Sequence, residues 1–109
     1  MSGGANEAPN AARGEAAFSI GGRVMTVRPS FAALVAAEGE IGSLLALADR
    51  AAQGRVLLAE IEALIWHCLG DRPAEMDRAA LGEALLALGL TGAVPVLRTI
   101  LRQILAGGQ

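Results

Sequence analysis

Apolar and polar residues alternate near the start of this 109-residue sequence and repeat at helical spacing afterwards. In residues 14–29 the alternation flanks Gly21-Gly22, a pair that accepts the positive φ angles of a tight hairpin turn. The pattern therefore predicts a β-hairpin. Its expected register pairs Ile20 with Arg23, Phe18 with Met25 and Ala16 with Val27.

This register sorts the hairpin into two faces. The apolar face carries Ala16, Phe18, Ile20, Met25 and Val27. Because an isolated hairpin is only marginally stable, that face must rest on helices or on another chain. Val24 and Thr26 lie on the opposite face, beside an edge that we expect to be open. They are therefore candidate partner-binding residues.

The remaining chain has the spacing of helices. Residues 30–53 predict two short helices, or one helix kinked between Gly39 and Gly42, with Ser30 as N-cap. The next helix is expected over residues 55–69, and a fourth is capped by Asp77 and ended by Gly89. Their expected apolar stripes are Ile41, Leu44, Leu45, Ala48 and Ala52; then Leu57, Ile61, Leu64, Ile65 and Cys68; then Leu81, Leu85, Leu86 and Leu88.

The last helix carries the strongest apolar stripe and is expected to start near Ala93, with Pro95 in its first turn. Two interpretations of this stripe stay open: it is core, or it lines a partner-binding groove. Arg98 and Arg102 lie opposite it, as a solvated face or as contacts for an acidic partner or a phosphate. Trp66 is either at the core rim or an exposed partner anchor. The stripe consists of Leu97, Ile100, Leu101, Ile104 and Leu105.

The elements together predict an α+β fold, an N-terminal β-hairpin followed by a bundle of four to five short helices. We expect residues 1–13 to be a disordered tail, because they are small and polar, and residues 14–107 to form a single domain. The composition is 53% hydrophobic and only 3% aromatic, which is typical of a helical chain with one core.

Composition and residue spacing argue against a disulfide, a zinc site and a catalytic carboxylate pair. The lone Cys68 excludes an intramolecular disulfide, and one histidine with one cysteine gives no zinc ligand set. His67 is read as a surface or boundary residue and Cys68 as a core residue. The carboxylate pairs Glu38/Glu40, Glu60/Glu62 and Asp71/Glu75 are interpreted as solvated charges. We therefore expect that the protein is not an enzyme and that it binds no cofactor or metal.

Charge and hydropathy limit the classes of partner that the protein is expected to bind. Nine arginines, no lysine and eleven acidic residues give a net charge of −2, so the basic surface of a non-specific DNA binder is missing and nucleic acid is an unlikely partner. No apolar run reaches the roughly 20 residues of a membrane span, and no secretory signal is present. These features predict a cytoplasmic protein that contacts no membrane.

Several segments resemble the small tail proteins of gene transfer agents and related prophages. The opening Gly14–Arg23, with its "GE" start, strand and glycine turn, is similar to theirs, as are three later segments. The resemblance covers about residues 14–106, and an added N-terminal tail and Gly39 depart from the family pattern. The later segments are Phe31–Leu45, Ala63–Leu69 and Leu81 to the last helix.

Proteins of this family are labelled both as tail tube proteins and as tail assembly chaperones. The resemblance implies a non-enzymatic role in tail assembly, in which a chaperone binds the apolar tape-measure protein and helps tail tube subunits polymerise around it. Residues 15–28 supply only two short strands, too little for a lumen-lining barrel, so we favour the chaperone over the structural tube subunit. A small helical nucleic-acid-binding regulator is the further alternative, and a homo-oligomer remains open.

Overall fold

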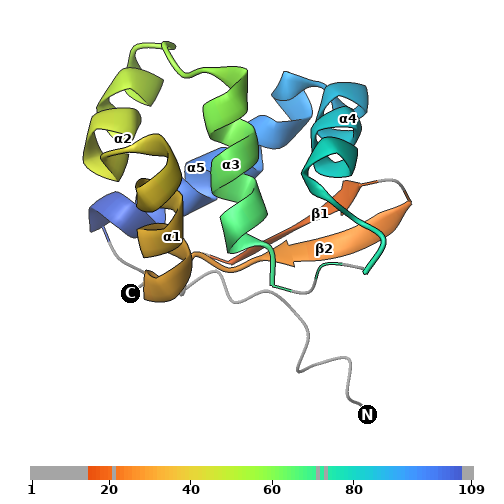
Figure 1. The fold of residues 1–109 in the computed structure, drawn as a ribbon. Coiled ribbons are helices and arrows are strands. Elements are labelled where there is room, and N and C mark those ends of the chain that lie inside the picture. Colours follow the sequence, from red (N-terminus) through yellow and green to blue (C-terminus); the bar gives the residue numbers. More distant parts are fainter. Residues whose placement is uncertain (1–14, 21, 71, 73, 107–109) are drawn as a thin grey trace.

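The described part of the computed structural model, residues 15–20, 22–70, 72 and 74–106, forms a two-stranded antiparallel hairpin followed by five helices (Figure 1). This arrangement confirms the α+β prediction. The proposed tail, residues 1–13, and the proposed domain end at residue 107 lie outside the described residues. The elements are β1 (Ala16–Ile20), β2 (Arg23–Val27), α1 (Phe31–Ile41), α2 (Leu44–Ala52), α3 (Leu58–Cys68), α4 (Arg78–Leu88) and α5 (Leu90–Ala106).

The hairpin has the predicted register, with Ala16 opposite Val27 and Ile20 opposite Arg23. Met25 and Val27 are buried as expected, and the hairpin contacts α4 and α5. The side chains of Phe18 and Ile20 lie outside the described part of the chain.

The outer edge of β2 is less open than the sequence predicts. The Gly70 N–H donates to the Thr26 carbonyl at 3.2 Å, and the Arg28 N–H donates to the Cys68 carbonyl at 2.6 Å. The segment after α3 therefore covers the edge at Thr26, because it supplies the missing strand partner. Val24, near the turn end of β2, stays 75% exposed.

The helical stretch over residues 30–53 breaks at Gly42-Ser43, and the axes of α1 and α2 differ by 78°. Gly42 has φ 90° and ψ −164°, a conformation open almost only to glycine. Ser43 then caps α2 by accepting from the Ala46 N–H, and the Glu38 carboxylate accepts from the Leu44 N–H at 3.1 Å. Gly39 does not interrupt α1, since it lies within the helix.

Gly39 and Gly42 should respond oppositely to alanine. Gly39 is exposed inside α1, and an added Cβ meets nothing within 4 Å, so Gly39→Ala should stabilise the fold by about 1 kcal/mol through helix propensity. Gly42→Ala should destabilise it by about 1–3 kcal/mol because the backbone conformation disfavours a side chain. Thermal unfolding checks both: a shift of the melting temperature in the same direction for both variants would contradict this account.

Helices α3 and α4 each bury fewer residues of their predicted apolar stripes than expected. α3 starts at Leu58 rather than at residue 55, so Leu57 is an N-cap and is exposed. Asp77 caps α4 as predicted, but Leu86 is 64% exposed and Leu88 is also exposed. Leu81 and Leu85, one turn apart, already occupy the face of α4 that meets the core, and Leu86 points away from that face. Leu88 is on the same face as Leu81 but at the last position of the helix. In α2, Leu45 is exposed and Leu47 takes the core position.

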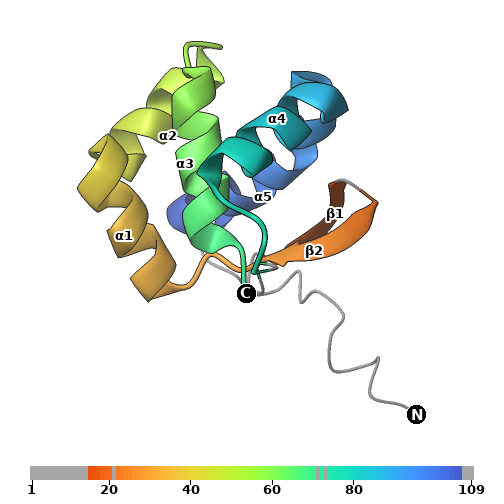
Figure 2. The ribbon, with the colours of Figure 1, turned by 45° about the vertical axis from the view of Figure 1, so that its right-hand side comes forward.

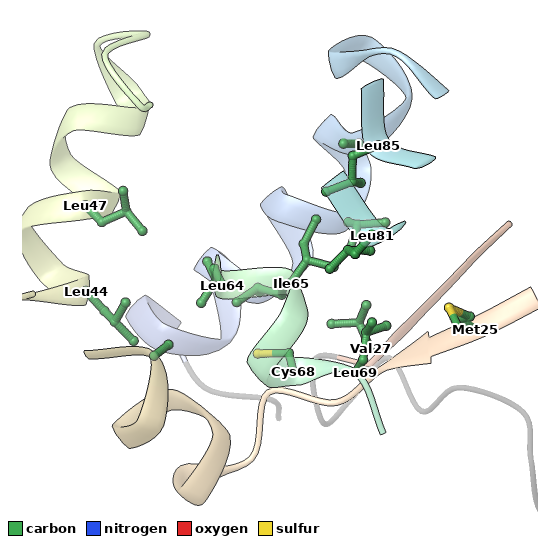
Figure 3. Close-up of a cluster of buried hydrophobic side chains, with 14 residues drawn as sticks. Met25, Val27, Leu44, Leu47, Leu64, Ile65, Cys68, Leu69, Leu81 and Leu85 are labelled. Atoms are coloured by element: carbon green, nitrogen blue, oxygen red, sulfur yellow. The ribbon is translucent and has the colours of Figure 1, made fainter. Parts of the chain in front are cut away.

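The core gathers around α3. Figure 3 shows Leu44 and Leu47 of α2 on one side of this helix and Leu81 and Leu85 of α4 on the other. Met25 and Val27 close the core from the hairpin side (Figure 3). Cys68 is buried within this cluster, as predicted, and burial raises the pKa of its thiol to about 12, so the thiol stays protonated.

Helix α5 begins at Leu90, three residues earlier than predicted, which puts Pro95 inside the helix. It runs behind α3 in Figure 1, and the turned view in Figure 2 shows it beside α4. Direct contacts join it to both α2 and α4. Among the described helices no single one has the length and hydropathy of a membrane span, although two bent pairs meet those criteria together.

Candidate functional site

An open apolar groove lies between α2 and α5 and has a volume of about 660 Å³. It is lined mostly by alanine, valine, leucine and isoleucine side chains, and Val94 and Leu105 of α5 are 41% and 63% exposed. The described lining residues are Ala48, Ala51, Ala52, Gly54, Val56, Ile61, Ala93, Val94, Leu97, Arg98, Leu101, Arg102, Leu105 and Ala106.

The groove follows from the small residues of α2. Ala48, Ala51 and Ala52 face α5, and their methyl groups are too short to cover its leucines. Leu97 and Leu101 consequently remain only partly buried. An apolar surface left accessible in this way is a typical protein-binding surface.

The apolar residues of helix α5 are therefore divided between the core and the groove. Val96 and Ile100 point into the core, and Ile100 is 0% exposed. Leu97, Leu101 and Leu105 follow one another at spacings of four residues along the groove. Part of the predicted stripe is therefore core and part lines the open groove, because the apolar arc of α5 is wider than the core requires.

Arg98 and Arg102 form the charged rim of the groove, so they lie beside the leucines of the apolar stripe rather than opposite the stripe as predicted. Both are exposed and stand one helical turn apart. Neither forms an ion pair or a side-chain hydrogen bond with any described residue. No described residue that lines the groove is acidic. The groove is thus a cationic surface on a chain whose net charge is −2.

The other predicted partner-binding residues lie elsewhere. Ile100 belongs to the core and Ile104 is half-buried against it. Val24, Thr26 and Trp66 do not line the groove. Sequence reasoning in turn missed the alanines of α2 together with Gly54, Val56 and Ile61. The alanines are visible in the sequence as small residues on a short helix, but such a pattern does not indicate a groove unless the helix that packs opposite is known.

Trp66 lies at the rim of the core, in the centre of a polar cluster. The Arg72 guanidinium carbon is 4.1 Å from the centroid of its ring and that of Arg78 is 5.6 Å away, which are cation–π distances. Arg78 also binds Glu62 at 2.6 Å and Glu40 at 2.8 Å. These contacts link α4 to α1 and α3. Trp66 is half-buried and has guanidinium groups against its ring, so it contributes to the fold.

Several predicted solvated charges are ion-paired. His67 Nε2 lies 2.8 Å from Glu40 Oε1. Glu60 pairs with Arg50 at 2.7 Å and also accepts from the Leu57 N–H, at the start of α3. The expected solvated status of Glu60 and Glu62 is therefore wrong, because both are half-buried beside arginines. Glu40 is exposed, as predicted, and is also ion-paired. Asp71 lies outside the described residues.

The Arg78 cluster predicts acid sensitivity. Hydrogen bonds from Arg78 and then His67 hold the pKa of Glu40 at about 2, below its ordinary 4.5. Its contribution to stability is therefore complete above about pH 5 and is lost as the pH falls towards about 2.

The measurement is thermal unfolding across this pH range for the wild type and Glu40→Gln. The melting temperature of the wild type should fall more steeply than that of the variant. Glu83→Gln is the control, because Glu83 is exposed and has no ion-pair partner among the described residues. Parallel profiles for all three proteins would rule out a role for the Glu40 ion pair.

Within the described residues, no three His, Cys, Asp or Glu side chains are grouped as metal ligands. The groove offers apolar contact and two guanidinium groups. Such a surface can bind and orient another molecule.

Comparison with known proteins places these features in a family. The family model described as "Phage tail tube protein, GTA-gp10" matches residues 13–107. Searches among curated proteins and among solved structures gave no significant match. The matched range spans the hairpin and all five described helices. The chain therefore belongs to the phage and gene-transfer-agent tail protein family of this description.

Proposed function

We propose that this tail protein is a non-enzymatic assembly chaperone that binds the tape-measure protein and helps the tail tube assemble around it. The observation that carries the proposal is the open apolar groove between α2 and α5. An aggregation-prone apolar client bound in such a groove has a lower free concentration, so mass action favours assembly over precipitation.

A structural tube subunit is the second candidate, and the family description favours it. The secondary structure supports it less well. The described residues include only two five-residue strands, β1 and β2, and the outer edge of β2 is partly covered near Thr26. A lumen lined by strands needs longer strands with free edges to continue the sheet from one subunit to the next.

The proposal is tested by an aggregation assay. The tape-measure protein of the same gene cluster is diluted from denaturant with and without this protein, and turbidity is recorded. A chaperone should suppress turbidity up to a saturating molar ratio. Turbidity equal to that with the same mass of an unrelated soluble protein would refute the chaperone function.

A further inference from the structure

The arginines on the rim of the groove indicate the charge of the molecule that binds there, which the apolar lining alone does not. The described arginines outside the groove are engaged: Arg23, Arg28, Arg50 and Arg78 with carboxylates, Arg55 with Gln53, and Arg72 with Trp66. Arg98 and Arg102 are left on the rim without a described partner. Guanidinium groups beside an apolar surface favour carboxylates on whatever occupies it.

The spacing of the two arginines restricts the shape of the occupant. They are four residues apart on α5, so they project from the same side of the helix one turn apart. Leu97, Leu101 and Leu105 run parallel to them along the groove. A second helix lying along α5 can contact both the leucines and the arginines. Its apolar residues must recur every three or four positions, and two of its acidic residues must be one turn apart.

We infer that the groove binds one amphipathic helix of the client, whose apolar face packs on Leu97, Leu101 and Leu105 while carboxylates one turn apart pair with Arg98 and Arg102. This inference rests on the proposed chaperone function for the identity of the client. It adds a recognition rule: acidic amphipathic segments bind, and basic segments of equal hydrophobicity are rejected.

The test uses the full chain and fluorescent synthetic peptides of about 18 residues, or five helical turns. One peptide has leucines at helical spacing flanked by glutamates one turn apart, a second has lysines in place of the glutamates, and a third is a scramble of the first. Binding is followed by fluorescence anisotropy at about 0.05 M and about 0.3 M salt. The acidic amphipathic peptide should bind roughly tenfold more tightly than the basic one at low salt.

The double variant Arg98→Glu/Arg102→Glu should reverse this preference. Because both side chains are exposed, circular dichroism should show an unchanged fold. The matched control Arg23→Glu/Arg72→Glu has the same net charge but alters two exposed residues that do not line the groove, and should keep the preference for the acidic peptide. Equal binding of acidic and basic peptides, binding of the scramble, or no binding at all would overturn the inference.

Other occupants give different results. If a DNA duplex binds and the double variant abolishes that binding, the arginines recognise phosphate. If light scattering shows that the protein alone forms a dimer that the double variant dissociates, a second copy fills the groove. Either result overturns the inference.

The aggregation assay contains no peptide, so it separates the two claims. Equal suppression of aggregation by the wild type and the double variant would leave the chaperone function standing and remove the recognition rule. Expected peptide results together with no suppression by the wild type would remove the tape-measure protein as the client.

Discussion

Ile100→Asp is expected to abolish cooperative folding, whereas Leu105→Asp, on the same helix, is expected to leave the protein folded. Ile100 is 0% exposed and packs within the core cluster, so the substitution leaves a cavity and buries an unpaired carboxylate. The cost is on the order of 5 kcal/mol, comparable to the whole stability of a small domain.

Leu105 is 63% exposed at the end of the groove. An aspartate there loses little packing and meets only the unfavourable end of the helix dipole, a cost below about 1 kcal/mol. Chemical denaturation followed by circular dichroism measures both variants. A folded Ile100→Asp variant, or an unfolded Leu105→Asp variant, would contradict the division of α5 between core and groove.

Ala52→Trp is expected to block the groove and remove most of the chaperone activity. Ala52 is exposed at the end of α2 and lines the groove, where an indole ring occupies space that the client needs. Because a few central contacts dominate most binding energies, losing this space should weaken client binding by tenfold or more, or roughly 1.4 kcal/mol.

The control is Ala46→Trp, which adds the same side chain to an exposed position of α2 outside the groove. Both variants should unfold at nearly the wild-type temperature. In the aggregation assay, Ala46→Trp should suppress turbidity as the wild type does. With Ala52→Trp most of the turbidity seen without chaperone should remain. Equal activity of the two variants would show that the client binds elsewhere.

Local sequence features predicted much of this fold because they depend on near neighbours. The hairpin register follows from alternation around Gly21-Gly22, and the ends of α4 follow from the Asp77 cap and from Gly89. The start of α5 was misplaced because Pro95 is favoured in a first turn, yet here the helix extends five residues before it.

Features that depend on helix packing could not be predicted in the same way. The α5 stripe contains both Ile100 and Leu105, and periodicity alone does not tell which side faces the core. Glu40 and Arg78 are 38 positions apart in the sequence, so their contact exists only once α1 and α4 are packed against α3. The groove itself is produced by α2 alanines opposite α5 leucines, two segments that sequence reasoning treated separately.

The central claim is that the protein holds the tape-measure protein soluble during tail assembly. Co-expression of the two proteins, followed by light scattering of the soluble fraction, tests it most directly. The account predicts a soluble complex of defined mass, whose stoichiometry follows from that mass. If the tape-measure protein precipitates regardless, and this protein alone forms tubes or stacked rings, the claim is contradicted and the protein is a structural subunit of the tube.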